Sequence, residues 1–136
     1  ETQPKWKHSR FRKSVNLFNV DLCNEAIRKW NSDTVILVEG PWDVAKLCQA
    51  GFWNTMATLG AGVSGGQVEI IKSMGISNVI LFMDNDDGGR SHEQQNSQKL
   101  NRASIQVNVI YPPEEGMDVG DMTTGQIKDT LRRLKK

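Results

Sequence analysis

The side chains of this sequence best suited to chemistry are carboxylates that recur just after apolar runs of residues. Acids of this kind repel one another when they converge, and their hard oxygen atoms are neutralised best by Mg²⁺ or Mn²⁺. They therefore indicate a divalent-cation site, the kind of site that handles phosphate groups. The acids concerned are Glu39 and Asp43, Asp84 and Asp86, and Asp118 and Asp121.

The elements that must position these acids follow from the hydrophobic pattern. Continuous apolar and β-branched runs predict strands over 34–38, 55–59, 78–83 and 107–111. Apolar stripes at three- to four-residue spacing predict helices between them, one starting at Pro41 and a last one carrying Ile127, Leu131 and Leu134. Alternating strands and helices predict an α/β fold with about four mainly parallel strands flanked by helices.

Two other helices carry more specific predictions. Asn19 is expected to cap the first helix, whose stripe of Cys23, Ala26, Ile27 and Trp30 should face a core. The segment 90–101 is so polar that it predicts an exposed helix, in which only Leu100 and Ala103 can face the core.

The carboxyl ends of parallel strands meet at one edge of a sheet, and ligands collect there. Three separate loops would therefore deliver the acids to the same edge. A single acid at a strand end is more often a turn or helix-capping residue. The set converging on one edge favours a bound cation.

Length and composition narrow the class of protein. A chain of 136 residues is about the size of one domain. No run approaches the ~18 consecutive apolar residues of a membrane span, and the polar start has no signal-peptide pattern. Cys23 and Cys48 lack zinc-ligand or disulfide-framework spacing, so we expect no zinc and a reducing, intracellular setting.

Charge is unevenly distributed along the chain. Residues 1–14 and 128–136 each carry five Lys and Arg against one acid, whereas the stretch between them carries seven against fourteen. Basic ends around an acidic centre suggest a polyanion held by the ends and a cation held in the middle, although solvated tails would look the same. Aromatic residues interleave the first cluster, which suits a nucleic-acid route. Its members are Lys5, Lys7, Arg10, Arg12 and Lys13.

A glycine-rich turn over 60–65 matches the Gly-x-Gly-x-x-Gly pattern between a predicted strand and a predicted helix. This context allows a dinucleotide-binding site, with Asp84 on a ribose. The turn follows the second strand rather than the first, however, and that interpretation leaves Glu39 and Asp118 without a role. The same loop can hold phosphates at a helix N-terminus through Gly60, Gly62 and Ser64.

Three acidic segments resemble the motifs of the Toprim domain, which topoisomerases, bacterial-type primases, OLD-family nucleases and recombination mediators share. They are Val-Glu-Gly-Pro-Trp-Asp-Val at 38–44, Met-Asp-Asn-Asp at 83–86 and Gly-Met-Asp-Val-Gly-Asp at 116–121. The run 35–62 is similar to that of primases and phage-type primase-helicases, and the resemblance covers roughly residues 9–124. Asn85 stands where a glycine is common.

The resemblance implies a Toprim (Rossmann-like) fold and metal-dependent nucleotidyl transfer, as in a DNA primase that makes RNA primers. Glu39 would be a general acid/base or metal ligand, Asp84 and Asp86 the metal-binding pair, and Asp118 the last acid. Asp43 and Asp121 would be supporting ligands. The implied cofactor is Mg²⁺ or Mn²⁺, and the implied partners are a single-stranded DNA template, nucleoside triphosphates, the RNA primer and a replicative helicase, with no membrane.

The expected organisation is a basic lead-in over 1–18 and a Toprim catalytic domain over 19–136, excised from a longer primase-like protein or working with another subunit. Two alternatives remain inside the Toprim group. One is a metal-dependent nuclease, and the other is a module that only binds DNA or a partner, which would not require the acids. A dinucleotide-binding Rossmann protein is the more distant alternative.

Overall fold

The computed structural model describes residues 16–60 and 62–135. Its centre is a sheet of four parallel strands in the order β2-β1-β3-β4. Val35 of β1 lies opposite Val79 of β3, which lies opposite Val107 of β4. The strands are β1 (Thr34–Val38), β2 (Thr55–Ala57), β3 (Asn78–Phe82) and β4 (Gln106–Ile110). The predicted parallel α/β architecture is confirmed.

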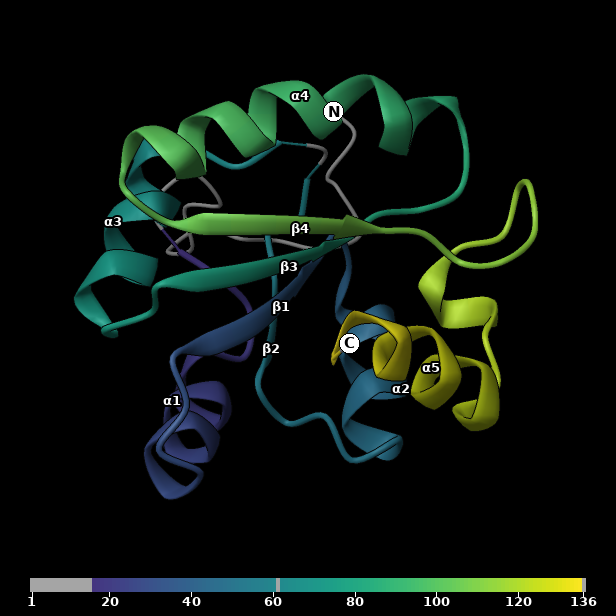
Figure 1. The fold of residues 1–136 in the computed structure, drawn as a ribbon, viewed down its shortest axis with the longest axis horizontal. Coiled ribbons are helices and arrows are strands. Elements are labelled where there is room, and N and C mark those ends of the chain that lie inside the picture. Colours follow the sequence, from purple (N-terminus) through teal and green to yellow (C-terminus); the bar gives the residue numbers. More distant parts are fainter. Residues whose placement is uncertain (1–15, 61, 136) are drawn as a thin grey trace, which may run out of the picture.

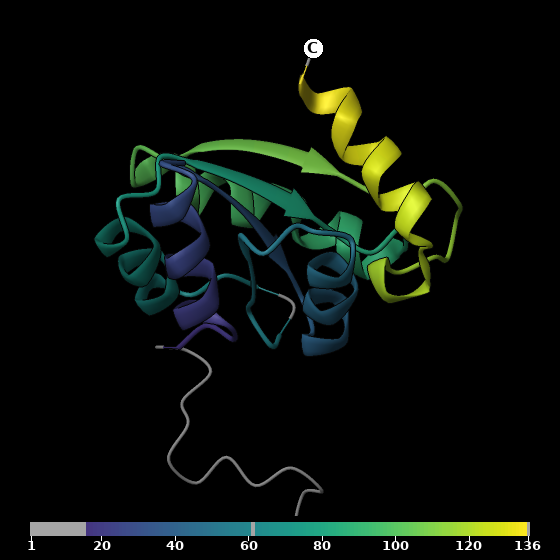
Figure 2. The same ribbon diagram turned by 90° about the horizontal axis from the view of Figure 1, so that it is seen from below.

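Helices cover both faces of this sheet, as Figures 1 and 2 show. Side chains from α1, α3 and α4 pack into the core on one face, and those from α2, α5 and η2 into the core on the other. The helices are α1 (Val20–Lys29), α2 (Pro41–Gln49), α3 (Gly65–Ser73), α4 (Asp87–Arg102) and α5 (Thr124–Arg132), with short 3₁₀ turns η2 (Val119–Asp121) and η3 (Arg133–Lys135).

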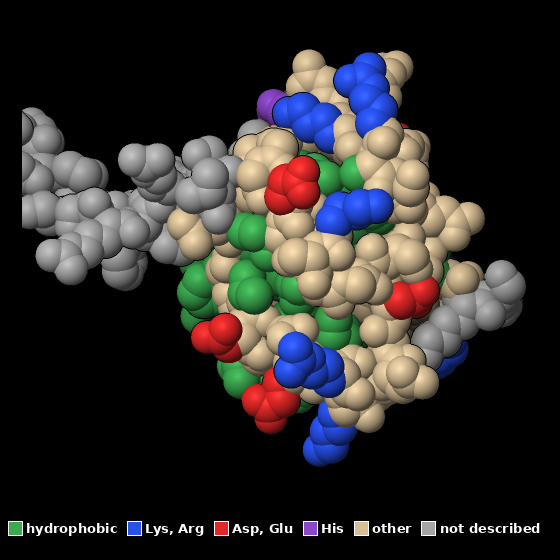
Figure 3. All heavy atoms as spheres, turned by 90° about the vertical axis from the view of Figure 1, so that its left-hand side faces the viewer, with side chains coloured by type: hydrophobic (Ala, Val, Ile, Leu, Met, Phe, Trp, Pro, Cys, Tyr) green, Lys and Arg blue, Asp and Glu red, His purple; other side chains and the backbone are tan. Residues whose placement is uncertain are grey.

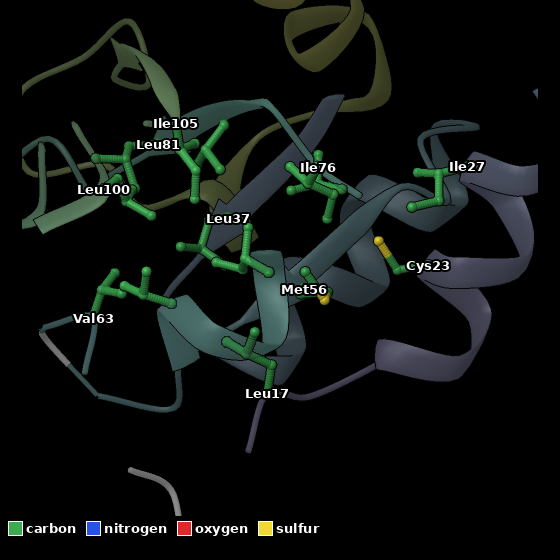
Figure 4. Close-up of a cluster of buried hydrophobic side chains, with 14 of the residues drawn as sticks. Leu17, Cys23, Ile27, Leu37, Met56, Val63, Ile76, Leu81, Leu100 and Ile105 are labelled. Carbon is green, nitrogen blue, oxygen red and sulfur yellow. The ribbon is translucent and has the colours of Figure 1, made fainter. Parts of the chain in front are cut away.

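Successive residues of β1 supply opposite cores, because strand side chains alternate between the faces of a sheet. Val35 and Leu37 join the cluster under α1, α3 and α4, part of which Figure 4 shows. Ile36 and Val38 join the cluster under α2 and α5. All four are at most 2% exposed, which explains why β1 reads as an unbroken apolar run rather than an alternating one.

Several local predictions need correction. The side chain of Asn19 makes no capping hydrogen bond to α1 and instead donates to the carbonyl oxygen of Thr55, 3.1 Å away, on β2. Trp30 lies at the C-terminal end of α1 and is 46% exposed, so it lies outside the buried stripe. The second strand ends at Ala57, and Leu59 adopts a left-handed conformation (φ 62°) that no strand continues through.

The polar helix differs from the prediction at both its start and its packing. It begins at Asp87 rather than Arg90, because the Asp86 side chain caps it. Asn96 is 3% exposed, so a polar side chain joins Leu100 on the core face, whereas Ala103 is only half-buried. Within the described residues, no helix is both long and apolar enough to cross a bilayer.

Candidate functional site

The acids from the three loops act on one another electrostatically. Glu39 follows β1 directly, and the negative charges of Asp84, Asp86 and Asp43 all raise its pKa. Asp84 follows β3 and in turn experiences the charges of Asp118 and Asp86. Residues up to 79 positions apart in the chain therefore share one edge of the sheet.

Burial and mutual repulsion make this edge hold protons more tightly than acids in water do. Burial, then the charge of Asp84, raises the pKa of Glu39 to about 7. Burial, then the same neighbour, raises the pKa of Asp43 to about 6. The pKa of Asp84 is also raised, chiefly by burial, although its hydrogen bond with Glu39 opposes that shift. The hydrogen bond between the two raises the pKa of Glu39 and lowers that of Asp84, so it favours the proton on Glu39.

Three of the acids also cap local structure, each with one carboxylate oxygen. Asp43 Oδ2 accepts from the N–H of Gly40 at 3.2 Å, and Asp86 Oδ1 accepts from the N–H of Gly89 at 2.8 Å. Asp118 Oδ1 accepts from the N–H of Asp121 at 2.9 Å. A capping role and a ligand role are compatible, because an ionised carboxylate has two oxygens and about four acceptor positions.

The η2 turn connects the third loop to the other two. Its Val119 N–H donates to Asp84, and its Gly120 N–H donates to Asp43. Asp121 behaves differently from the other acids. It is exposed, and its Oδ2 accepts from the N–H of Asp118 at 3.3 Å. Its charge is not among the causes of the raised pKa values at Glu39, Asp43 or Asp84. Asp121 therefore lies at the margin of the cluster.

Asn85, between the paired acids, ties the second loop to the third. Its Nδ2 donates to the carbonyl oxygen of Pro112 at 2.8 Å, and its backbone exchanges hydrogen bonds with Gly116 (2.6 Å) and Met117 (2.9 Å). Arg90 completes the tether by donating to Asn85 Oδ1 at 2.7 Å and pairing with Glu115 at 2.8 Å. A glycine at this position would lack the side-chain half of these contacts.

The start of α4 lies unusually close to the paired acids. A Cβ built on Gly89 would be 2.1 Å from the carbonyl oxygen of Asp84, a distance that no side chain tolerates. Glycine therefore lets the first turn of α4 press against the backbone of Asp84.

The glycine-rich turn begins beside Glu39, whose carbonyl oxygen accepts from the N–H of Leu59 at 2.9 Å. The hydroxyl of Ser64 is the N-cap of α3 and accepts from the N–H of Gln67 at 3.1 Å. Gly60 and Gly62 are both exposed. The turn thus leads from the acidic edge into the N-terminus of α3, where exposed backbone N–H groups are placed to bind phosphates.

Two buried polar side chains hold this turn, and the sequence did not single them out. Gln67 donates to the carbonyl oxygens of Asn16 (2.8 Å) and Thr58 (3.0 Å). Asn96 Oδ1 accepts from the N–H of Val63 at 2.9 Å. The available signal was helical spacing, since Asn96 lies four residues before Leu100 and so shares its core-facing side.

The expected basic residues Lys5, Lys7, Arg10, Arg12 and Lys13 lie outside the described residues. In the part of the chain that the structure describes, no three His, Cys, Asp or Glu side chains are arranged to hold a metal ion. The donor set nevertheless fits a hard divalent cation in its chemistry. It consists of clustered carboxylates whose mutual repulsion a cation would relieve.

Comparisons with known proteins agree with this geometry. The model of the Toprim-like family matches residues 36–123. A DNA primase of Staphylococcus aureus is 34% identical over 120 residues, which are 85% of this chain and 19% of that protein. The crystal structure of the zinc-binding and RNA polymerase domains of the Aquifex aeolicus primase has a TM-score of 0.80 and 30% identity, covering 98% of this chain and 33% of that one.

A third relative was solved with DNA. The RNA polymerase domain of the Mycobacterium tuberculosis primase, in complex with double-stranded DNA, has a TM-score of 0.73 and 25% identity, covering 90% of this chain and 40% of that one. The chain spans about a fifth of the curated primases it matches. Since the family model matches well over half of the chain and places all three acidic loops inside the match, the protein belongs to the Toprim-like family.

Proposed function

We propose that this chain is the metal-dependent nucleotidyl-transfer core of a DNA primase, which synthesises RNA primers on single-stranded DNA. The observation that carries the proposal is the convergence of Glu39, Asp84 and Asp118 from three loops onto one edge, where the charge of Asp118 raises the pKa of Asp84 and the charge of Asp84 raises the pKa of Glu39. The likeness to primases supports this activity over the nuclease alternative.

In this proposal Glu39, Asp84 and Asp86 hold Mg²⁺ or Mn²⁺, with Asp118, Asp43 and Asp121 around them. A bound divalent cation neutralises phosphate charge and aligns the attacking hydroxyl, which is most of what phosphoryl transfer requires. The capping hydrogen bonds of Asp43, Asp86 and Asp118 fix these side chains before any ligand arrives.

Glu39 is suited to move a proton. With its pKa at about 7, the carboxyl group can both accept and release a proton near neutral pH. Its role would be either to take up the proton that the attacking 3′-hydroxyl loses or to complete the shell of the cation, because a directly bound cation would lower its pKa. The turn with Gly60, Gly62 and Ser64 follows Leu59, whose N–H donates to the carbonyl oxygen of Glu39, and its exposed backbone would contact phosphate oxygens.

The proposed primase activity also determines which partners the protein would bind. A primase needs a single-stranded template, nucleoside triphosphates and the growing RNA primer, and it works beside a replicative helicase at replicating DNA in the cytoplasm. The DNA complex of the M. tuberculosis domain supports a nucleic-acid partner for this fold. Lys5, Lys7, Arg10, Arg12 and Lys13, from the basic lead-in over 1–18, would contribute phosphate contacts.

A Mn²⁺ titration followed by amide NMR tests the metal centre, because paramagnetic broadening maps bound metal onto residues. We expect selective signal loss around Glu39, Asp84 and Asp118 in the wild type, and none in Asp84→Asn combined with Asp86→Asn. A variant with Glu69→Gln and Glu114→Gln serves as the charge-matched control, since both side chains are exposed and lie outside the acid cluster. It should broaden like the wild type.

A second measurement separates nucleotidyl transfer from hydrolysis. The protein is incubated with Mn²⁺, labelled ribonucleotides and an RNA primer annealed to a single-stranded DNA template. Extension that requires Asp84 and Asp86 supports the proposal. Metal-dependent cleavage of the strands without extension favours the nuclease. In the NMR titration, uniform rather than selective broadening at millimolar Mn²⁺ would contradict a metal centre at these acids.

A further inference from the structure

One exposed aromatic side chain lies at the acidic edge and is not used by the proposed chemistry. Trp42 is 70% exposed, more than the other large exposed hydrophobic side chains of the described residues. It occupies the first turn of α2, between Pro41 at the start of the helix and the buried Asp43. An aromatic ring is thus displayed beside a group of carboxylates.

Trp42 makes a close contact with the third acidic loop. A Cβ built on Gly120 would be 2.5 Å from Cδ1 of Trp42 and 3.2 Å from Oδ1 of both Asp43 and Asp118. The pyrrole edge of the indole therefore rests on the α-carbon of Gly120, between two acids. Glycine leaves room for this contact, so the ring lies against η2 while most of its surface stays open to solvent.

The other exposed tryptophans of the described residues occupy a different kind of surface. Trp30 and Trp53 line a hollow beside α1 with Leu22 and Ala26, and with one side chain of each charge, Glu25 and Lys29. Figure 3 views the side of the molecule where α1 and α3 lie and shows hydrophobic side chains gathered there. Trp42 has instead acids and a glycine around it. An apolar partner would suit the first surface and would have to bury carboxylates at the second.

A ligand at Trp42 has to contact an exposed aromatic ring and also tolerate the carboxylates beside it. A nucleotide meets both requirements. Its base is flat and uncharged and can stack on the indole, as bases do in proteins that bind single strands. Its phosphates would be drawn to the adjacent acids through the cation of the proposed function. A basic peptide could also meet an indole and carboxylates, through cation–π contact and ion pairing, but it would compete with that cation rather than require it.

We propose that Trp42 is a base-stacking subsite, which binds the nucleobase of a nucleotide or single strand whose phosphates face the acid cluster. The inference rests on the proposed function, because it takes the phosphates to be held at Glu39, Asp84 and Asp86. Trp42 would bind without sequence preference, since stacking requires only the face of a base.

Binding of a single-stranded oligodeoxynucleotide that contains 2-aminopurine tests the subsite, because stacking on an indole quenches that base. With Mg²⁺ present, we expect the wild type to quench and bind it, and Trp42→Ala to bind about tenfold more weakly, in the range for the loss of one stacked base. Trp42→Phe should retain most of the affinity. Trp53→Ala removes another exposed tryptophan, on the other surface, and should bind like the wild type.

Mn²⁺ binding to the same proteins separates this inference from the proposed function. Trp42→Ala should bind Mn²⁺ like the wild type, and Asp84→Asn with Asp86→Asn should lose both Mn²⁺ and the Mg²⁺-dependent quenching. Unchanged oligonucleotide binding by Trp42→Ala, or no binding by a wild type that does take up Mn²⁺, overturns the subsite and leaves the metal centre standing. The base-stacking subsite is also overturned if Mg²⁺ suppresses the quenching instead of being required for it. It is overturned as well if an oligo-arginine peptide binds to the wild type but not to Trp42→Ala, and if the oligonucleotide does not displace that peptide.

Discussion

At the scale of single residues, the acids of the cluster fall into two groups according to the hydrogen-bond partners of their carboxylate oxygens. Asp43, Asp86 and Asp118 each cap a turn or helix, so their geometry is fixed by backbone hydrogen bonds. Glu39 and Asp84 hydrogen-bond each other. A carboxyl pair of this kind is stabilised by a shared proton and loses that stabilisation when the proton leaves, which makes it the pH-sensitive part of the cluster.

Replacing Glu39 with glutamine should make the metal-free protein more stable at high pH. Because its folded pKa, about 7, lies above the ordinary value of 4.5, the folded state holds a proton that the unfolded state has released. Its contribution to stability is therefore fully present below pH 4.5 and is lost as the pH rises to 7. Thermal melting in EDTA should show Glu39→Gln above the wild type at pH 8, by on the order of 3 °C. An equal difference at pH 5 would contradict this origin.

At the scale of elements, loops from distant parts of the chain are held together by a few specific contacts. The start of α4 reaches Asp84 through Gly89, the 112–118 loop reaches Asn85, and η2 reaches Asp43 and Asp84 through its N–H groups. None of these contacts belongs to the sheet. The strands bring the loops to one edge, and these contacts then determine how closely the acids approach.

Gly89→Ala adds only one methyl group but should lower the unfolding free energy strongly. The added methyl group would lie 2.1 Å from the carbonyl oxygen of Asp84, so the first turn of α4 has to move away from the acids. Overpacking of this kind costs about 1–3 kcal/mol of unfolding free energy, which urea denaturation measures. Gly88→Ala is the matched control on the same turn, since its nearest contact would be Asp86 Oδ1 at 3.4 Å. Similar losses in both variants would contradict the close approach as the cause.

Asn85→Ala should loosen the loop that carries Asp118. The variant loses the hydrogen bonds from Nδ2 to Pro112 and from Arg90 to Oδ1. We expect faster hydrogen exchange at the amides of Gly116 and of residue 85, which form the backbone bonds between the two loops, a loss of about 0.5–1.5 kcal/mol of stability and weaker Mn²⁺ binding. Glu114→Ala changes the same loop at an exposed side chain and should leave the exchange rates unchanged. Wild-type exchange in Asn85→Ala would show that the backbone contacts suffice.

At the scale of the whole molecule, the parallel sheet concentrates negative charge at one edge while two separate cores stabilise the rest. Helices on both faces leave the carboxyl ends of the strands as the place where loops meet. The protein thus carries a charge cluster that opposes its own folding at neutral pH, and a cation bound there would return that stability.

Mg²⁺ should therefore stabilise the folded protein, and more so as the pH rises. At pH 5.5 protons already occupy part of the cluster, because the pKa values of Glu39, Asp43 and Asp84 are raised, so Mg²⁺ has to displace them. At pH 8 a concentration tenfold above the dissociation constant would add about 1.4 kcal/mol. Melting curves with Mg²⁺ against NaCl of equal ionic strength measure this shift. A shift that is independent of pH, or that persists in Asp84→Asn with Asp86→Asn, would place the ion elsewhere.

The amino-acid sequence was sufficient for the alternation of strands and helices, since β1 and β3 are continuous apolar runs and the helices other than α4 carry apolar stripes. It was sufficient too for the family, because the acidic segments keep their order and their place after the strands. It misjudged Trp30 and the end of the second strand. Terminal residues of an element are set by tertiary contacts, such as the bond from Asn19 to Thr55, more than by periodicity.

Only the tertiary structure decided how the candidate site is assembled. The spacing of Asp84 and Asp86 cannot reveal that Asp86 caps α4, that Asn85 holds the third loop, or that Asp121 lies at the margin. Nor can it distinguish Trp42, on an acidic edge, from Trp30 and Trp53, in a hollow beside α1. Local patterns fix which way a side chain faces along its own element, whereas neighbours such as Gly120 and Gly89 come from far along the chain, and their contacts exist only once the sheet has brought them together.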